Sequence, residues 1–169
     1  MIRVYVSVGS NVDRETNVRA AVAALRAEFG SLVISTVYAS RAIGFSGEDF
    51  YNLVVGFRTD QPVHAVLERL RGIEAERGRK RSDSRFGPRT LDIDLLLYGD
   101  LVLCDDKVRV PREEIARYAF VLGPLAEIAG ELRHPETGER ISDLWSRFEA
   151  DDQVLTPVPF VWQEIVATS

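Results

Sequence analysis

The sequence is poor in cysteine and histidine. Cys104 is the only cysteine among 169 residues, which excludes an intramolecular disulfide and suits a reducing compartment. No base stands near Cys104 in the sequence, so we expect it in a strand rather than in the role of a nucleophile. The two histidines, His64 and His134, stand apart without the spacing of metal ligands and predict no metal site.

Long hydrophobic runs are also missing. No apolar stretch approaches the length needed to cross a bilayer, so we expect no membrane partner. The chain enters a strand pattern at Val4 with no signal peptide before it, and we therefore expect a cytoplasmic protein. The phosphate-loop pattern Gly-x-x-x-x-Gly-Lys-Ser/Thr is absent, and a conventional nucleoside-triphosphatase fold is unsupported.

Positive charge is concentrated in one segment. The formal net charge is −5, yet residues 69–89 contain eight basic and three acidic residues, so this segment carries +5 and the remainder −10. Such a chain is a poor general binder of nucleic acid, because duplex affinity needs many phosphate contacts. The basic segment is better suited to binding one polyphosphate molecule. A solvated helix face is the alternative, but residues 78–84 have little apolar content and are typical of a loop.

A strand pattern with two carboxylates follows this segment. Residues 91–95 alternate, so Asp92 and Asp94 leave the same face roughly 7 Å apart. Like charges this close repel each other unless cations lie between them, and Mg²⁺ with bound phosphates is the natural solution. Arg85 and Arg89 supply fork-shaped donors for phosphate oxygens. The alternative is a charged edge strand whose carboxylates pair with these arginines.

The periodicity predicts one domain over residues 1–169, with the size and hydrophobic content to bury a core. We expect strands at 2–8, 33–38, 50–57, 91–98, 101–103 and 108–110, and helices at 14–29, from Pro62 to before Gly78, at 119–128 and at 142–148. Asp13 is the expected cap of the first helix. The order strand–helix–strand–strand–helix–strand predicts an α+β, ferredoxin-like (split βαβ) fold, an antiparallel sheet with flanking helices on one face.

Residues 85–96, Arg-Phe-Gly-Pro-Arg-Thr-Leu-Asp-Ile-Asp-Leu-Leu, resemble the signature of the 6-hydroxymethyl-7,8-dihydropterin pyrophosphokinase family of folate biosynthesis. The resemblance extends from about Val4 to Trp145. It includes, in order, Gly9-Ser10-Asn11, Phe50-Tyr51-Asn52, Ile73-Glu74, Gly78-Arg79, Phe120-Val121-Leu122 and Pro124-Leu125. Several short motifs in order are much more specific than one.

The resemblance implies transfer of the β,γ-pyrophosphoryl group of ATP to the hydroxymethyl group of a reduced pterin, with release of AMP. It implies two Mg²⁺ ions on Asp92 and Asp94, and a catalytic role for these residues with Arg79 and Arg89. The residues implied in ATP binding are Glu74, Arg79, Arg81, Arg85, Arg89, Leu95 and Arg112. Those implied in pterin binding are Ser40, Ala42, Ile43, Phe50, Asn52, Asp92 and Phe120.

Each of these residues also has a structural interpretation. Phe50 and Phe120, which the resemblance makes a sandwich around the pterin, are equally typical of core packing. Asn52 is typical of a strand end or turn, and each arginine taken alone is typical of a surface. Glu74 is also placed to pair with Arg71 or Arg77 at a separation of three residues.

The chain departs from the family pattern in three places. Arg41-Ala42 stands where prolines are frequent, and Arg112 follows Val110-Pro111 where a histidine is usual. Tyr118 occupies the place of a common arginine, with Arg117 one step earlier. Arg112 is a cation that can replace the histidine, and Arg117 is near enough in sequence to replace the arginine.

Three hypotheses follow. The first is an active pyrophosphokinase with small-molecule substrates and no nucleic-acid partner, working as a monomer. The second, motivated by Arg41-Ala42, is a paralogue acting on a modified pterin. The third is a non-catalytic ferredoxin-like module that binds RNA on its sheet, which requires a strand with interleaved basic and aromatic residues. Residues 91–97 present two carboxylates instead.

Overall fold

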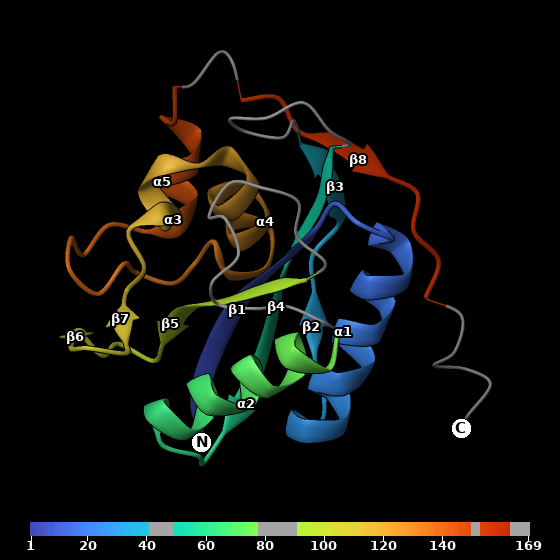
Figure 1. Ribbon diagram of the computed structural model, residues 1–169. Helices are drawn as coiled ribbons and strands as arrows, with labels where there is room; N and C mark the ends of the chain where they lie inside the picture. The colour runs from blue at the N-terminus through green and yellow to red at the C-terminus, as the bar shows by residue number, and fades with distance from the viewer. Residues whose placement is uncertain (41–48, 78–90, 150–152, 163–169) are drawn as a thin grey trace.

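An antiparallel sheet with the strand order β5–β1–β4–β3–β8 occupies the centre of the molecule, and β2 also pairs with β4 (Figure 1). The computed structural model describes residues 1–40, 49–77, 91–149 and 153–162. The strands are β1 (Ile2–Ser10), β2 (Val33–Ile34), β3 (Val37–Ser40), β4 (Phe50–Thr59), β5 (Asp92–Tyr98) and β8 (Thr156–Val158). β6 (Leu103–Cys104) and β7 (Arg109–Val110) form a separate hairpin.

Helices cover both faces of this sheet. They are α1 (Arg14–Phe29), α2 (Val63–Glu76), α3 (Glu114–Arg117), α4 (Ala119–Ala129) and α5 (Ile141–Ser146). α1 and α2 lie on one side, whereas α3, α4 and α5 lie on the other, where α4 contacts β3 and β4 (Figure 1). The predicted order of elements and the α+β class are confirmed. The prediction that helices lie on one face is wrong.

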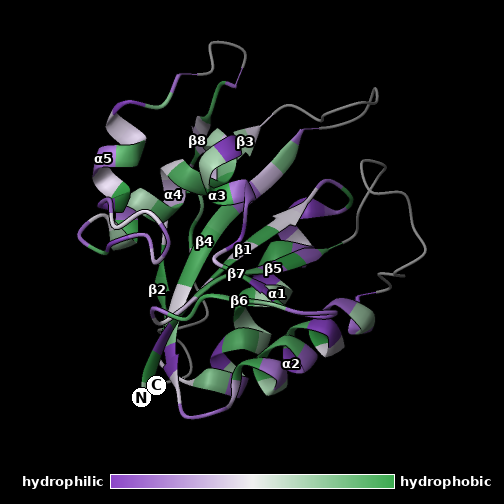
Figure 2. Ribbon diagram, turned by 90° about the vertical axis from the view of Figure 1, so that its left-hand side faces the viewer, coloured by the Kyte–Doolittle hydropathy of each residue, from purple (hydrophilic) through white to green (hydrophobic). Residues whose placement is uncertain are grey.

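The reason for the second layer is that both faces of the central strands are apolar. Val6, Leu53 and Ile93 pack under α1 and α2, while Tyr5 and Leu96 belong to a separate core cluster with α4 and α5. In Figure 2 the central strands are coloured as hydrophobic along most of their length. A face of this kind must be buried against another element, and α4 provides it.

Two local expectations differ from the structure. Asp13 does not cap α1 through its side chain and instead adopts left-handed φ and ψ of 43° and 49°. Asn17, inside the helix, donates a 2.6 Å hydrogen bond to the carbonyl of Val12 and so ties the turn to α1. The strand expected at 33–38 is divided into β2 and β3. Among the described residues, no helix has the length and apolar character to cross a membrane.

Candidate active site

The register of the sheet brings Asn52, a predicted pterin residue, and the two predicted metal ligands onto one face. Gly9 of β1 lies opposite Asn52 of β4 on one side and Asp92 of β5 on the other. Two positions along, Ser7 lies opposite Asp94. Because side chains alternate between faces along a strand, Asn52, Asp92 and Asp94 share a face with Tyr5 and the α4 layer. The side chain of Leu95 packs in the α1–α2 core instead, so only its backbone could contact a nucleotide.

Gly9 keeps this face open beside Asn52. A methyl group added at Gly9 would lie 3.0 Å from Oδ1 of Asn52 and 3.9 Å from the ring of Phe50. The buried Asn52 amide donates a 2.5 Å hydrogen bond to Oγ of Ser40 on β3. The absence of a side chain at Gly9 therefore lets Asn52, Ser40 and Phe50 meet at one end of the sheet.

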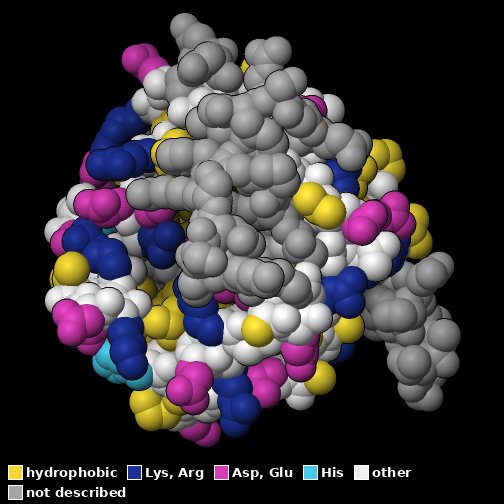
Figure 3. All heavy atoms as spheres, viewed as in Figure 1, with side chains coloured by type: hydrophobic (Ala, Val, Ile, Leu, Met, Phe, Trp, Pro, Cys, Tyr) yellow, Lys and Arg dark blue, Asp and Glu magenta, His cyan; other side chains and the backbone are white. Residues whose placement is uncertain are grey.

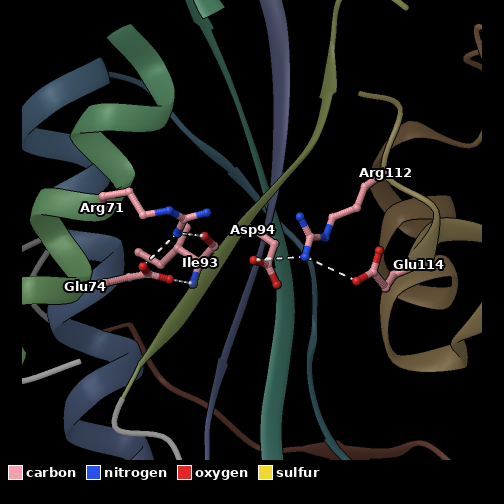
Figure 4. Close-up of polar contacts among 6 residues, drawn as sticks. All are labelled: Arg71, Glu74, Ile93, Asp94, Arg112 and Glu114. Carbon is pink, nitrogen blue, oxygen red and sulfur yellow. Dashed lines mark hydrogen bonds and ion pairs between the residues drawn. The ribbon is translucent and has the colours of Figure 1, made fainter. Parts of the chain in front are cut away.

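A clamp from α2 holds the strand between the two carboxylates. The Glu74 side chain is buried, with 2% of its surface exposed. Its Oε2 accepts a 2.7 Å hydrogen bond from the Ile93 N–H. Its Oε1 accepts a 2.7 Å bond from Arg71, which also donates to the Ile93 carbonyl at 3.0 Å (Figure 4). The pairing of Glu74 with Arg71 is confirmed, whereas its contact with ATP stays a prediction.

Arg112 approaches Asp94 from the other side of the site. Its Nη2 lies 3.6 Å from Oδ1 of Asp94 and 3.2 Å from Oε2 of Glu114, while its backbone N–H donates a 3.0 Å hydrogen bond to the carbonyl of Leu96 (Figure 4). Burial opposes the charge of the guanidinium, but the carboxylates of Asp94, Glu114 and Asp92 outweigh it and raise the pKa of Arg112. Arg112 is therefore a permanent cation beside the carboxylate pair.

Aromatic rings stand at the start of β4 and of α4. Phe50 and Phe120 are both half-buried, so each retains an exposed part, as a ligand-stacking residue requires. The ring of Phe120 stacks on that of Tyr118, with centroids 5.0 Å apart and planes inclined by 18°. Tyr118, where an arginine is common in the family pattern, thus extends an aromatic surface. The predicted sandwich around a pterin stays a prediction.

One supporting residue was missed by the sequence reasoning. Gln153, in the tail, accepts a 2.7 Å hydrogen bond from the Ala119 N–H and donates a 3.1 Å bond to the carbonyl of Arg117. It thereby satisfies backbone groups at the first turn of α4, next to Phe120. No motif marks it, because its partners are 34 and 36 residues away. The Arg117 residue is exposed, and its replacement of the missing arginine stays a prediction.

The remaining predicted residues lie outside the described part of the chain. They are Arg79, Arg81, Arg85, Arg89, Ala42 and Ile43, together with the departure at Arg41. Their roles stay predictions.

The carboxylate pair fits a hard divalent cation. Asp92 and Asp94 are half-buried on one face and offer only oxygen ligands. Within the described ranges, no three acidic, histidine or cysteine side chains group as a metal cage. Mg²⁺ is usually held by one or two carboxylates and completed by phosphate oxygens and water, and this site supplies that number of protein ligands.

Comparison with known proteins shows the family of this chain. Residues 5–130 match the family model described as 7,8-dihydro-6-hydroxymethylpterin-pyrophosphokinase. A Pseudomonas aeruginosa 2-amino-4-hydroxy-6-hydroxymethyldihydropteridine pyrophosphokinase is 38% identical over 146 residues, covering 84% of this chain and 89% of the relative. The Bacillus subtilis protein of the same name is 36% identical over 137 residues, covering 79% and 81%.

A solved structure has the same fold. The chain superposes on a crystal structure of an HPPK-DHPS in complex with substrates, with a TM-score of 0.68 and 13% identity. The match covers 86% of this chain but 43% of the larger one. A Plasmodium falciparum HPPK-DHPS gives a TM-score of 0.65 and 13% identity, covering 87% and 41%. At this identity the likeness supports the fold alone.

The clamp on Ile93 generates a stability prediction. We expect Glu74→Ala to lower the free energy of unfolding by about 2–4 kcal/mol, because it leaves the Ile93 N–H and the Arg71 guanidinium without their carboxylate. Urea denaturation measures this loss. Glu76→Ala, two positions along α2 at an exposed site, is the matched control and should change stability by less than about 0.5 kcal/mol. Equal losses in the two variants would refute the clamp.

The crowding at Gly9 generates a binding prediction. We expect Gly9→Ala to raise the KM for the pterin about tenfold, the equivalent of one lost hydrogen bond, because the new methyl group displaces the Asn52 amide. Gly72→Ala is the control: nothing lies within 4 Å of its added methyl group, and Ala favours the helix. Steady-state kinetics with the pterin varied compare the two. An unchanged KM in Gly9→Ala would contradict the prediction that Asn52 binds the pterin.

Proposed function

The chain belongs to the family of 7,8-dihydro-6-hydroxymethylpterin-pyrophosphokinases, and from this premise we propose how its residues perform the reaction. The enzyme transfers pyrophosphate from ATP to 6-hydroxymethyl-7,8-dihydropterin in folate biosynthesis, and gives the pterin diphosphate and AMP. It is an ATP-dependent diphosphotransferase. The observation that carries the site assignment is the row Asn52–Gly9–Asp92 across three strands.

The chemistry is an in-line displacement at phosphorus. The hydroxymethyl oxygen of the pterin forms a bond to the β-phosphorus, the bond from that phosphorus to the oxygen bridging to the α-phosphate breaks, and the hydroxyl proton is released. AMP leaves with the bridging oxygen. In such transfers catalysis is mostly positioning and neutralisation of charge, with little covalent work for the protein.

We propose that Asp92 and Asp94 hold two Mg²⁺ ions, which neutralise the triphosphate. Asp92 lies in the same row as Asn52, so it also borders the pterin. The clamp by Glu74 and Arg71 orients both carboxylates through the backbone of Ile93. Preorganised groups of this kind avoid reorganisation during the reaction.

The nucleotide is assigned to the cationic side of the site. Arg112 supports this assignment, because it is a half-buried cation 3.6 Å from Asp94. We propose that Arg79 and Arg89 act in catalysis and that Arg81 and Arg85 bind phosphates with Arg112. Glu74 and the backbone of Leu95 complete the proposed nucleotide contacts.

The pterin is assigned to the end of the sheet next to Gly9. We propose that Phe50 and Phe120 stack on its two faces and that Asn52 reads its edge, where an amide offers both a donor and an acceptor. Ser40, hydrogen-bonded to Asn52, fixes the amide. The backbone of Ala42 and Ile43 is proposed to complete this subsite.

We further propose that residues 1–169 form one catalytic domain that acts as a monomer in the cytoplasm. The exposed, unpaired Cys104 supports a reducing compartment. A nucleic-acid partner is not proposed: on the face shown in Figure 3, acidic and basic side chains intermingle among the described residues, whereas binding of duplex phosphates favours a basic stripe.

The product formed from ATP tests the proposed reaction. With protein, MgATP and 6-hydroxymethyl-7,8-dihydropterin, we expect AMP to appear in step with the pterin diphosphate, measured by chromatography. ADP as the product would indicate ordinary kinase chemistry and would overturn the assignment. Turnover of a modified pterin in preference to this substrate would favour the paralogue hypothesis.

Replacement of a metal ligand tests the site. We expect Asp94→Ala to lower kcat by at least about 100-fold, because the triphosphate loses charge neutralisation, while circular dichroism stays unchanged. Asp100→Ala, at an exposed turn after β5, is the matched control and should retain normal turnover. A near-normal rate in Asp94→Ala would eliminate the carboxylate from catalysis.

A further inference from the structure

We propose that Arg112 is an exchangeable counter-ion of Asp94, which keeps divalent metal from binding the carboxylates until it arrives with the nucleotide. Before ATP binds, the guanidinium neutralises Asp94. When the metal-bound triphosphate enters, Arg112 leaves Asp94 and pairs with phosphate. This inference rests on the proposed function, since it concerns the same carboxylates.

The Arg112 guanidinium lies closer to Glu114 than to Asp94. Its backbone is fixed to β5 by the hydrogen bond to the Leu96 carbonyl at 3.0 Å, only two residues beyond Asp94. Its Nη2 is closer to Glu114, at 3.2 Å, than to Asp94, at 3.6 Å. The guanidinium can therefore leave Asp94 while Glu114 still holds it.

The donor capacity of Arg112 is incompletely used in this state. Nε is buried, and it has no hydrogen-bond partner in the described structure. A buried donor without an acceptor costs free energy, so the side chain gains by a move that supplies one. A phosphate group offers several oxygens to the planar fork of a guanidinium, which the single long contact with Asp94 does not.

The charges explain why the exchange matters. A guanidinium within 4 Å of Asp94 opposes a divalent cation on the same oxygens, because like charges at such separations repel strongly in a half-buried site. Metal alone therefore binds weakly. Metal carried by ATP brings phosphates that attract Arg112 away, so the binding of metal and nucleotide becomes mutually dependent. A histidine, usual here in the family pattern, is largely neutral near pH 7 and lacks this permanent charge.

Metal binding in the absence of nucleotide tests the proposal. Mn²⁺ alone is titrated into the full-length protein and followed by electron paramagnetic resonance, without ATP or pterin. We expect Arg112→Met to bind Mn²⁺ at least about fivefold tighter than the unchanged protein, because the positive charge of Arg112 no longer competes with the metal at Asp94. Arg112→Lys is the matched control, which retains the charge and should stay within about twofold.

A second measurement separates this role from a structural one. Binding of a non-hydrolysable ATP analogue with Mg²⁺, measured by calorimetry, should weaken about tenfold in Arg112→Met, because the phosphates lose a cation. The two affinities thus move in opposite directions, whereas general damage to the site weakens both. Arg112→Gln repeats the test if the methionine variant does not fold.

The Mn²⁺ titration decides the matter. Neutral variants that bind Mn²⁺ no tighter than the unchanged protein overturn the proposal, whether all bind weakly or none binds. Because this titration contains neither substrate, its result does not depend on which nucleotide product the enzyme forms. An ADP product would thus refute the reaction and leave the counter-ion exchange to be judged by its own measurement.

Discussion

The site depends on how one strand residue is held. Ile93 lies between the two aspartates, and its N–H and carbonyl are bonded to Glu74 and Arg71 of α2. The direction of each aspartate side chain follows from the backbone on either side of Ile93, so a helix on the far face of the sheet determines the geometry of the near face. The ion pairs on the two faces are also separate: Glu74 pairs with Arg71 on the side of α2, and Arg112 lies beside Asp94 on the other side.

The strands and the carboxylate row could be predicted from local patterns. Alternation in residues 91–95 predicted that Asp92 and Asp94 share a face, and β5 confirms it. The periodicity of residues 14–29 and 119–128 predicted α1 and nearly all of α4. These features are set by side chains a few positions apart, which a single sequence contains.

The features that were missed depend on distant partners. Three consecutive leucines in β5 indicate burial on both faces, yet which helix covers the second face is decided by packing of α4 on β3 and β4. Asp13 is a residue type typical of a helix cap, but the turn before α1 is held by the hydrogen bond from the Asn17 side chain. Gln153 reaches the start of α4 from the tail, and no local pattern predicts such a contact.

The tail has a consequence for how copies of the chain meet. β8 covers the open side of β3, and at its middle Pro157 lies opposite Tyr38. A proline has no N–H to donate, and a three-residue strand offers little length for pairing. The edge of the sheet formed by β8 is therefore a poor partner for a strand from a neighbouring molecule. The same tail that bonds to the first turn of α4 thus also opposes fibre-like self-association at this edge.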